Sequence, residues 1–137
     1  MKNIDKDIEF GLTGEQYTKP FIEKSLGITI EKTLDEYHSF DFVSEDRTTF
    51  IEVKTRNITY ACAKYYKELF ISTSKINYIK HNPTNTYYFC YNLHDAILLY
   101  KYSTSKLNTT INGRMDEGLK KLCLLPVKDM DCIHYKN

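Results

Sequence analysis

The sequence predicts a mixed α/β fold, arranged as a single domain over residues 1–137. Three observations carry this prediction: helix-capping residues around a segment near the N-terminus, two strand-like segments joined by a charged turn, and an aromatic hairpin further along. A chain of 137 residues can bury one hydrophobic core and is too short for two ordinary domains.

Composition limits the partners and the compartment. The 19 Lys and Arg residues balance 18 Asp and Glu residues, so binding to a polyanion must come from local clustering of charge. The cysteines, Cys62, Cys90, Cys123 and Cys132, form no Cys-x-x-Cys pair, and no apolar signal segment follows the polar start. No apolar run approaches membrane-spanning length. We therefore expect a cytoplasmic protein with reduced thiols and no membrane partner.

The first helix is expected over residues 13–26. Thr13, followed three positions later by Gln16, matches a capping box, and Gly27 is a favourable residue just after a helix end. Pro20 lies inside this segment, so we expect the helix either to bend there or to be regular only in its second half.

Glu15 is the notable residue of this helix. It shares a helical face with Ile22 and Leu26, so a carboxylate is carried on an apolar stripe that faces the core. An acid in that position needs a partner, although a first-turn glutamate favoured by the helix dipole is the commoner case.

Three strands follow as a meander. Residues 28–33 form a short β-branched run, and residues 40–44 and 49–55 lie on either side of a charged turn. This arrangement predicts two successive antiparallel pairings.

The last two strands carry a charged pattern. Because strand side chains alternate between faces, Glu52 and Lys54 point the same way. If Asp41 opposes the second half of the neighbouring strand, both carboxylates come within reach of one cation. The pattern predicts a divalent-metal site with a lysine beside it.

The later part of the chain contains a second helix and a hairpin. Residues 72–81 begin with capping residues and stop before Pro83, which favours a helix. Residues 86–91 and 96–102 are dense in aromatic and apolar side chains and predict a β-hairpin. Residues 103–118 are rich in turn formers and are expected to form a loop.

Residues 57–70, between the meander and the second helix, interleave aromatic rings with positive charge. This interleaving suits phosphate contacts and base stacking, and equally suits a plain covering segment. The residues concerned are Tyr60, Lys64, Tyr65, Tyr66, Lys67 and Phe70.

Four charged side chains resemble, in their order and setting, the active site of the PD-(D/E)XK nuclease superfamily: Glu15, Asp41, Glu52 and Lys54. Residues 11–15 and 51–55 look like the helix and strand motifs of Holliday-junction-resolvase and restriction-type members. The succession of elements is similar to a restriction endonuclease-like core over about two thirds of the chain. Phe40 precedes Asp41 where the family usually has proline.

The resemblance implies an endonuclease that hydrolyses phosphodiester bonds in DNA. Asp41 and Glu52, with the Val53 carbonyl and Glu15, would hold one or two Mg²⁺ or Mn²⁺ ions through hard oxygen ligands. Lys54 would orient the attacking water or neutralise charge that develops at phosphorus.

Three further cations are candidates for contacts with the nucleic-acid backbone. Arg56 shares the strand face of Lys54, Lys64 lies in the aromatic segment, and Lys75 lies at the start of the second helix. For Lys75 a solvated helix lysine is the commoner interpretation.

Other interpretations stay open at this point. The same residues also fit a catalytically silent nucleic-acid-binding or protein-interaction domain of the same fold, or an RNA endonuclease. The blandest interpretation is a solvated strand face with a surface pair between Glu52 and Lys54. Cutting both strands of a duplex would require a symmetric pair of chains, so we expect a homodimer.

Overall fold

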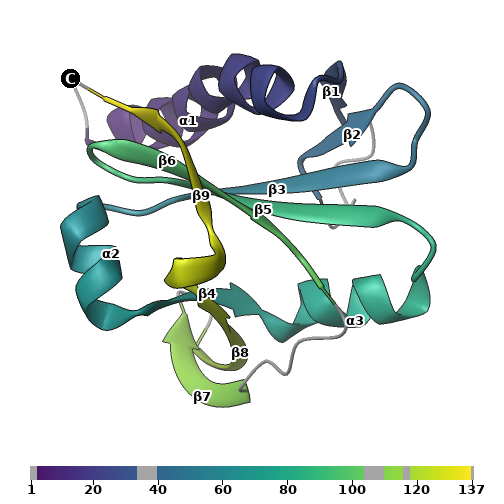
Figure 1. Cartoon of the computed structure of the whole chain (residues 1–137). Coiled ribbons are helices and arrows are strands. Elements are labelled where there is room, and N and C mark those ends of the chain that lie inside the picture. The colour runs from purple at the N-terminus through teal and green to yellow at the C-terminus, as the bar shows by residue number, and fades with distance from the viewer. Residues whose placement is uncertain (1–2, 34–39, 104–109, 116–117, 137) are drawn as a thin grey trace.

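The computed structural model describes the backbone of residues 3–33, 40–103, 110–115 and 118–136, and the side chains of residues 14–33, 40–103 and 122–136. Within these ranges the fold is mixed α/β (Figure 1). The helices are α1 (Asn3–Leu26), α2 (Tyr60–Tyr66), α3 (Thr73–His81) and a short 3-10 helix, η1 (Val127–Asp129). The strands are β1 (Ile30–Lys32), β2 (Phe42–Ser44), β3 (Thr49–Thr55), β4 (Glu68–Ser72), β5 (Thr86–Asn92), β6 (Ala96–Lys101), β7 (Thr110–Met115), β8 (Gly118–Pro126) and β9 (Asp131–Tyr135).

The main sheet is mostly antiparallel, with one parallel pair at its centre. Its six strands lie in the order β1-β2-β3-β5-β6-β9, and β3 and β5 are the parallel neighbours. The predicted meander is confirmed as β1, β2 and β3, and the predicted hairpin is confirmed as β5 and β6. The chain crosses from β3 to β5 through α2, β4 and α3, while β4, β8 and β7 form a second, antiparallel sheet.

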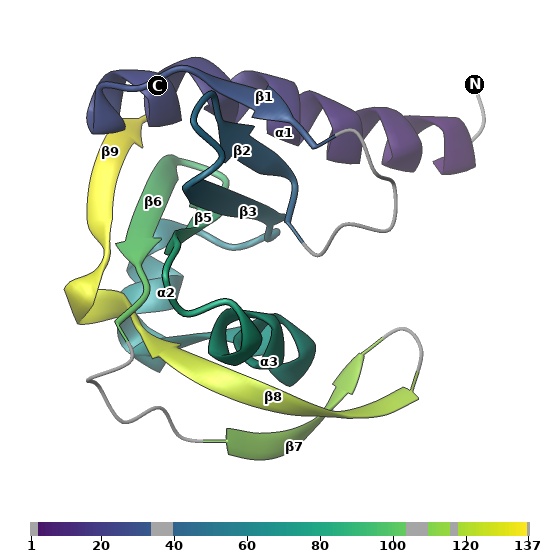
Figure 2. The same ribbon diagram turned by 90° about the vertical axis from the view of Figure 1, so that its right-hand side faces the viewer.

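Helices and the second sheet cover the two faces of the main sheet, as two views show (Figures 1 and 2). On one face α1 contributes Ile22 to a cluster with Ile51 and Val53 of β3. On the other face, α2, α3 and the small sheet pack against the larger core cluster, in which Phe89 is fully buried. Strand alternation explains this division, because Ile51 and Val53 point to α1 while Glu52 and Lys54 point to the α3 side.

Helix α1 is longer than predicted. It begins at Asn3 and not at Thr13, so the Thr13 capping box does not start a helix. The physical reason lies in the preceding residues, where Ile4, Ile8 and Leu12 recur every four positions and continue the helical period. The helix also continues through Pro20 to Leu26.

Two later segments contain secondary structure that the sequence did not predict. Residues 57–70 contain helix α2, capped by the Thr59 hydroxyl, and the start of β4, so this segment has regular secondary structure. The expected loop over 103–118 contains strand β7, in which Gly113 pairs with Lys120 of β8. Pairing with β8 overrides the turn preference of the Asn112-Gly113 dipeptide.

The remaining expectations concern the thiols and the membrane. All four cysteines are free thiols, as expected from their spacing. None of the helices in the described part of the chain is long and apolar enough to span a lipid bilayer.

Candidate functional site

Strand β3 brings Glu52 and Lys54 to one face, as predicted. The Lys54 Nζ lies 3.2 Å from the Glu52 carboxylate. Glu52 is only 4% exposed, so this face is not the solvated strand surface of the blandest interpretation. Burying a carboxylate costs free energy unless cations or hydrogen-bond donors compensate its charge. The burial of Glu52 therefore makes it a candidate for a functional residue.

Asp41 lies immediately before β2, where that strand meets the second half of β3. Its backbone N–H donates to the Ile51 carbonyl at 3.1 Å, and its Oδ2 accepts a hydrogen bond from the Val53 N–H at 2.8 Å. The predicted register is therefore present, with Asp41 beside the Glu52 position. The Val53 side chain is buried on the α1 face, and ligation by its carbonyl stays a prediction.

The Glu52 carboxylate affects the neighbouring Asp41 carboxylate. Burial raises the pKa of Asp41, and the neighbouring Glu52 carboxylate raises it further. The hydrogen bond from the Val53 N–H lowers the Asp41 pKa but does not cancel these effects. Desolvation plus a like charge is the combination that characterises carboxylates arranged for a cation or a shared proton.

Glu15 extends from helix α1, on the other face of the sheet, to the Asp41 carboxylate. Burial raises the pKa of Glu15, the Lys32 ammonium lowers it, and the Asp41 carboxylate raises it again. The Glu15 Oε2 pairs with Lys32 Nζ at 2.5 Å. The acid on the apolar stripe of α1 therefore has its partner, and it lies beside Asp41.

Gly14 explains how α1 comes close enough to place Glu15. A Cβ added to Gly14 would lie 2.5 Å from Thr55 Oγ1 and 3.3 Å from Asn92 Nδ2. With the Thr55 and Asn92 side chains in place, the absence of a side chain at Gly14 lets α1 pass this close to the ends of β3 and β5. The close approach at Gly14 thus determines how near the following residue, Glu15, lies to the sheet.

Lys75 is a member of the site whose importance the sequence understates. Its Nζ lies 3.3 Å from the Glu52 carboxylate, and its side chain is 18% exposed, so it is not a solvated helix lysine. A cation in the first turn of α3 is unfavourable for the helix dipole, and that turn contains no acidic residue. The Glu52 carboxylate supplies the compensating charge.

Lys32 is the member that sequence reasoning missed. It lies on the edge strand β1, where Lys32 pairs with Phe42 of β2. In the sequence, Lys32 is only a lysine at the end of a short strand. Its role can be recognised only when the strand register is known, because the register places it beside Glu15. The cluster therefore combines three carboxylates with three ammonium groups: Glu15, Asp41, Glu52, Lys32, Lys54 and Lys75.

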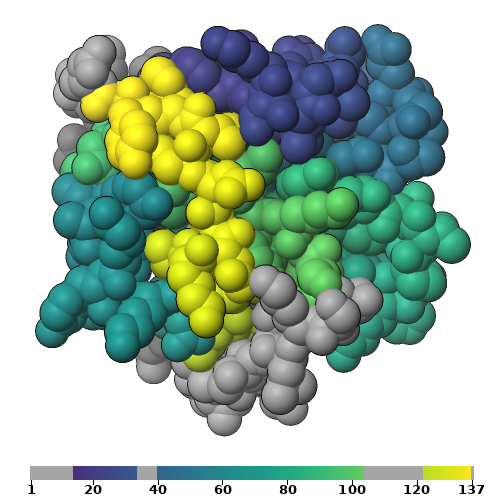
Figure 3. Space-filling view, viewed as in Figure 1, coloured from purple at the N-terminus to yellow at the C-terminus, as the bar shows by residue number. Residues whose placement is uncertain are grey.

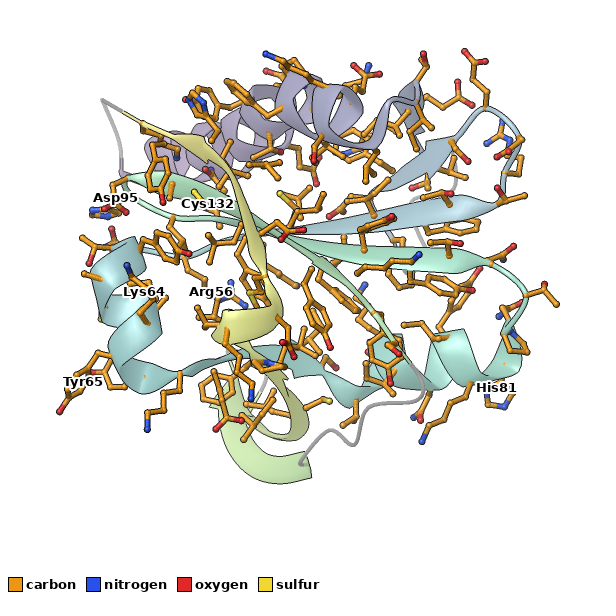
Figure 4. All side chains as sticks on the ribbon, viewed as in Figure 1. Arg56, Lys64, Tyr65, His81, Asp95 and Cys132 are labelled. Carbon is orange, nitrogen blue, oxygen red and sulfur yellow. The ribbon has the colours of Figure 1, made fainter. Side chains whose placement is uncertain are left out.

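The predicted backbone contacts Arg56 and Lys64 lie elsewhere. Arg56 donates from Nη1 to the Thr55 carbonyl, and it extends below the sheet in Figure 4, where its charge lowers the pKa of Tyr91 against the effect of burial. Lys64 lies on α2, with its Nζ 4.4 Å from the centre of the Tyr60 ring. Neither forms an ion pair with Glu52 comparable to those of the two lysines described above.

The donor chemistry of the cluster suits hard cations, because carboxylate oxygens are the ligands preferred by Mg²⁺ and Mn²⁺. In the described part of the chain, no set of three or more His, Cys, Asp or Glu side chains is already gathered as a ligand shell. In the present arrangement lysine ammonium groups hold Glu15 and Glu52.

Comparison with known proteins adds no assignment to this geometry. No family model matches the chain, and no curated protein matches it at a significant level.

Proposed function

We propose that this protein is an endonuclease that hydrolyses phosphodiester bonds in DNA with Mg²⁺ or Mn²⁺, at the cluster around Asp41 and Glu52. One observation carries the proposal. The buried Glu52 carboxylate forms an ion pair with Lys54 of the same strand, and it lies beside Asp41, whose pKa is raised by burial and by repulsion from Glu52. This combination lowers the stability of the folded protein, and perturbed groups of this kind are characteristic of functional sites.

The proposed metal ligands follow from donor type and proximity. Asp41 and Glu52 would hold the ion, and Glu15, with its pKa raised by burial and by Asp41, would hold a second ion or an ordered water. The bound ion would supply a Lewis acid that polarises the scissile phosphoryl group. The cost of bringing the carboxylates together would fall when a cation lies between them.

The lysines have separate roles in this proposal. Lys54 has a 26% exposed side chain, so its ammonium can reach a phosphoryl oxygen and neutralise charge that develops there. Lys75 is less exposed and positions the Glu52 carboxylate from the α3 side. The Val53 N–H fixes the orientation of the Asp41 carboxylate.

The order of elements supports a restriction endonuclease-like fold for this domain. Helix α1, the meander β1–β3, helix α3 and the strand β5, parallel to β3, follow one another as in the predicted core. We further propose that two copies act together on a duplex, because one cluster of this size serves one strand at a time.

A cleavage panel tests the proposal. Single-stranded DNA, duplex DNA, a four-way junction and RNA are incubated with the protein in Mg²⁺, in Mn²⁺ and in EDTA. We expect metal-dependent cleavage of at least one DNA form, and a loss of about 100-fold or more in Glu52→Gln. Because Glu52 is buried, circular dichroism must show that the variant is folded.

The matched control is Glu31→Gln. Glu31 lies on β1, is largely exposed and pairs with Arg47, so this variant removes a carboxylate without touching the cluster. Cleavage of no nucleic acid by the wild-type chain, or an unchanged rate in folded Glu52→Gln, would contradict the proposal. Cleavage of RNA alone would replace DNA by RNA as the substrate.

A further inference from the structure

A hollow of about 540 Å³ lies between α2, the start of β4 and η1, and none of the cluster residues lines it. In Figure 3 the teal surface of α2 and the yellow surface around η1 border each other on the face in view. We call this hollow the α2–η1 pocket and define it by six of its lining residues: Tyr60, Lys64, Lys67, Val127, Lys128 and Met130.

The floor and wall of the α2–η1 pocket are apolar. Val127 and Met130 are almost fully buried and present their outer surface to the pocket. The Tyr60 backbone N–H donates to Asp95 Oδ1 at 2.8 Å, which fixes the start of α2. The Tyr60 ring lies 6.1 Å from the Tyr135 ring. The Lys64 Nζ lies over the Tyr60 ring, 4.4 Å from its centre, so the pocket offers an apolar floor beside an aromatic ring that already interacts with a cation.

The rim of the pocket is basic. Lys64, Lys67 and Lys128 line it and are exposed, whereas Glu68 is the one acidic lining residue. Three positive charges against one negative charge leave a local excess of two in a protein whose formal net charge is +1. This local clustering is the condition under which a nearly neutral chain attracts a polyanion.

Lys67 occupies a backbone conformation that normally favours glycine. Its φ is 72°, and its N–H donates to the Ala63 carbonyl to cap α2. Its carbonyl accepts from the Val127 N–H at 2.9 Å, which ties the α2 end to η1. A side chain in this left-handed conformation costs about 1 kcal/mol relative to glycine.

Two exposed rings extend the aromatic surface of α2. Tyr65 is 81% exposed and Tyr66 is 66% exposed, and their ring centres lie 5.5 Å apart. Figure 4 shows Tyr65 projecting away from the body of the molecule. Exposed rings beside a basic rim provide stacking surfaces for further bases.

We propose that the α2–η1 pocket binds one nucleotide unit of a single-stranded nucleic acid, with the base on the apolar floor and against the Tyr60 ring, where it displaces the Lys64 ammonium toward the phosphates on the lysine rim. The hollow has the size of ordinary small-ligand sites, and base stacking plus phosphate neutralisation matches its two surfaces. The inference rests on the proposed function in taking the ligand to be a nucleic acid, but binding here requires neither metal nor cleavage.

Binding is tested in EDTA by fluorescence anisotropy with a dye-labelled, eight-residue single-stranded oligodeoxynucleotide. The triple variant Lys64→Ala, Lys67→Ala, Lys128→Ala is compared with a control triple variant, Lys24→Ala, Lys80→Ala, Lys101→Ala, which removes the same charge from exposed positions outside the pocket. We expect the pocket variant to bind at least about tenfold more weakly, with a slope of log K against log salt that is smaller by about 2. The control should bind like the wild type.

A second readout locates the ligand. The ¹³C-labelled Met130 methyl group lies in the pocket floor, so its NMR signal should shift when the oligonucleotide is added. Equal weakening in both triple variants, an unshifted Met130 signal, or equal competition by a polyglutamate peptide of the same charge would overturn the inference. A chain that binds at this pocket but cleaves no nucleic acid would contradict the proposed activity alone.

Discussion

Asp41→Asn is predicted to stabilise the folded protein at neutral pH while removing a proposed metal ligand. The amide oxygen of asparagine can still accept the hydrogen bond from the Val53 N–H, which the Asp41 carboxylate accepts at 2.8 Å. The substitution therefore keeps the local geometry and removes the charge that burial and the Glu52 carboxylate disfavour.

The expected magnitude follows from two opposing effects. Holding a charged carboxylate in a largely buried position beside another carboxylate costs roughly 2 kcal/mol. A hydrogen bond to a charged acceptor is stronger than one to a neutral acceptor by about 1 kcal/mol, so part of the gain is lost in Asp41→Asn. The difference is a stabilisation of about 1 kcal/mol, equivalent to an increase in Tm of about 3 °C for a domain of this length.

The pH dependence has a definite sign. Because folding raises the pKa of Asp41, the folded protein binds this proton more tightly than the unfolded chain does, and wild-type stability gains as pH falls through the folded pKa. Asparagine does not titrate. The advantage of Asp41→Asn is therefore complete above the folded pKa of Asp41 and is lost progressively as pH falls from the folded pKa to the unfolded pKa, which urea unfolding in EDTA at a series of pH values measures.

Asp46→Asn on the same hairpin is the matched control, and its sign is opposite. Hydrogen bonds from Ser44 and Thr48 lower the pKa of Asp46. The Asp46 contribution is present above the unfolded pKa and is lost as pH falls through the folded pKa, so Asp46→Asn should destabilise the protein at neutral pH. Destabilisation by Asp41→Asn at neutral pH, as in the control, would refute the reasoning about the carboxylate pair.

Three further predictions concern the elements around the two sites. Gly14→Ala should destabilise in urea unfolding by about 1 kcal/mol, because overpacking against Thr55 of about 2 kcal/mol exceeds a helix-propensity gain of about 1 kcal/mol; a Thr55→Ala background should remove the loss. Lys75→Met should lower the cleavage rate about tenfold with unchanged KM, since it loosens Glu52 and leaves substrate contacts in place; a changed KM alone would point to a phosphate contact. Lys67→Gly should stabilise the fold by about 0.5–1 kcal/mol in urea, and a loss of stability would show that its left-handed conformation is not strained.

The features that sequence could predict are those set by local periodicity. Alternation along β3 places Glu52 and Lys54 on one face whatever the rest of the chain does. The charged turn between β2 and β3 fixes an antiparallel hairpin, and with it the place of Asp41 beside Glu52. The capping residue Ser72 similarly marks the start of α3.

The features that sequence could not predict depend on packing between distant elements. Lys32 joins Glu15 only because the register of β1 and the close approach of α1 at Gly14 bring them together. Lys75 has the local signature of an exposed helix lysine, and it lies in the site because α3 packs under the sheet next to Glu52. The same packing buries Glu52, which a polar strand pattern does not reveal.

The most direct test of the proposed metal site is a calorimetric titration of Mn²⁺ into the wild-type protein and into folded Asp41→Asn. The wild type is expected to bind at least one ion, and the variant to bind it at least about tenfold more weakly, because a neutral amide replaces one of two carboxylate ligands. Absence of Mn²⁺ binding by the wild type, or equal affinity in the two proteins, would contradict the assignment of Asp41 and Glu52 as metal ligands.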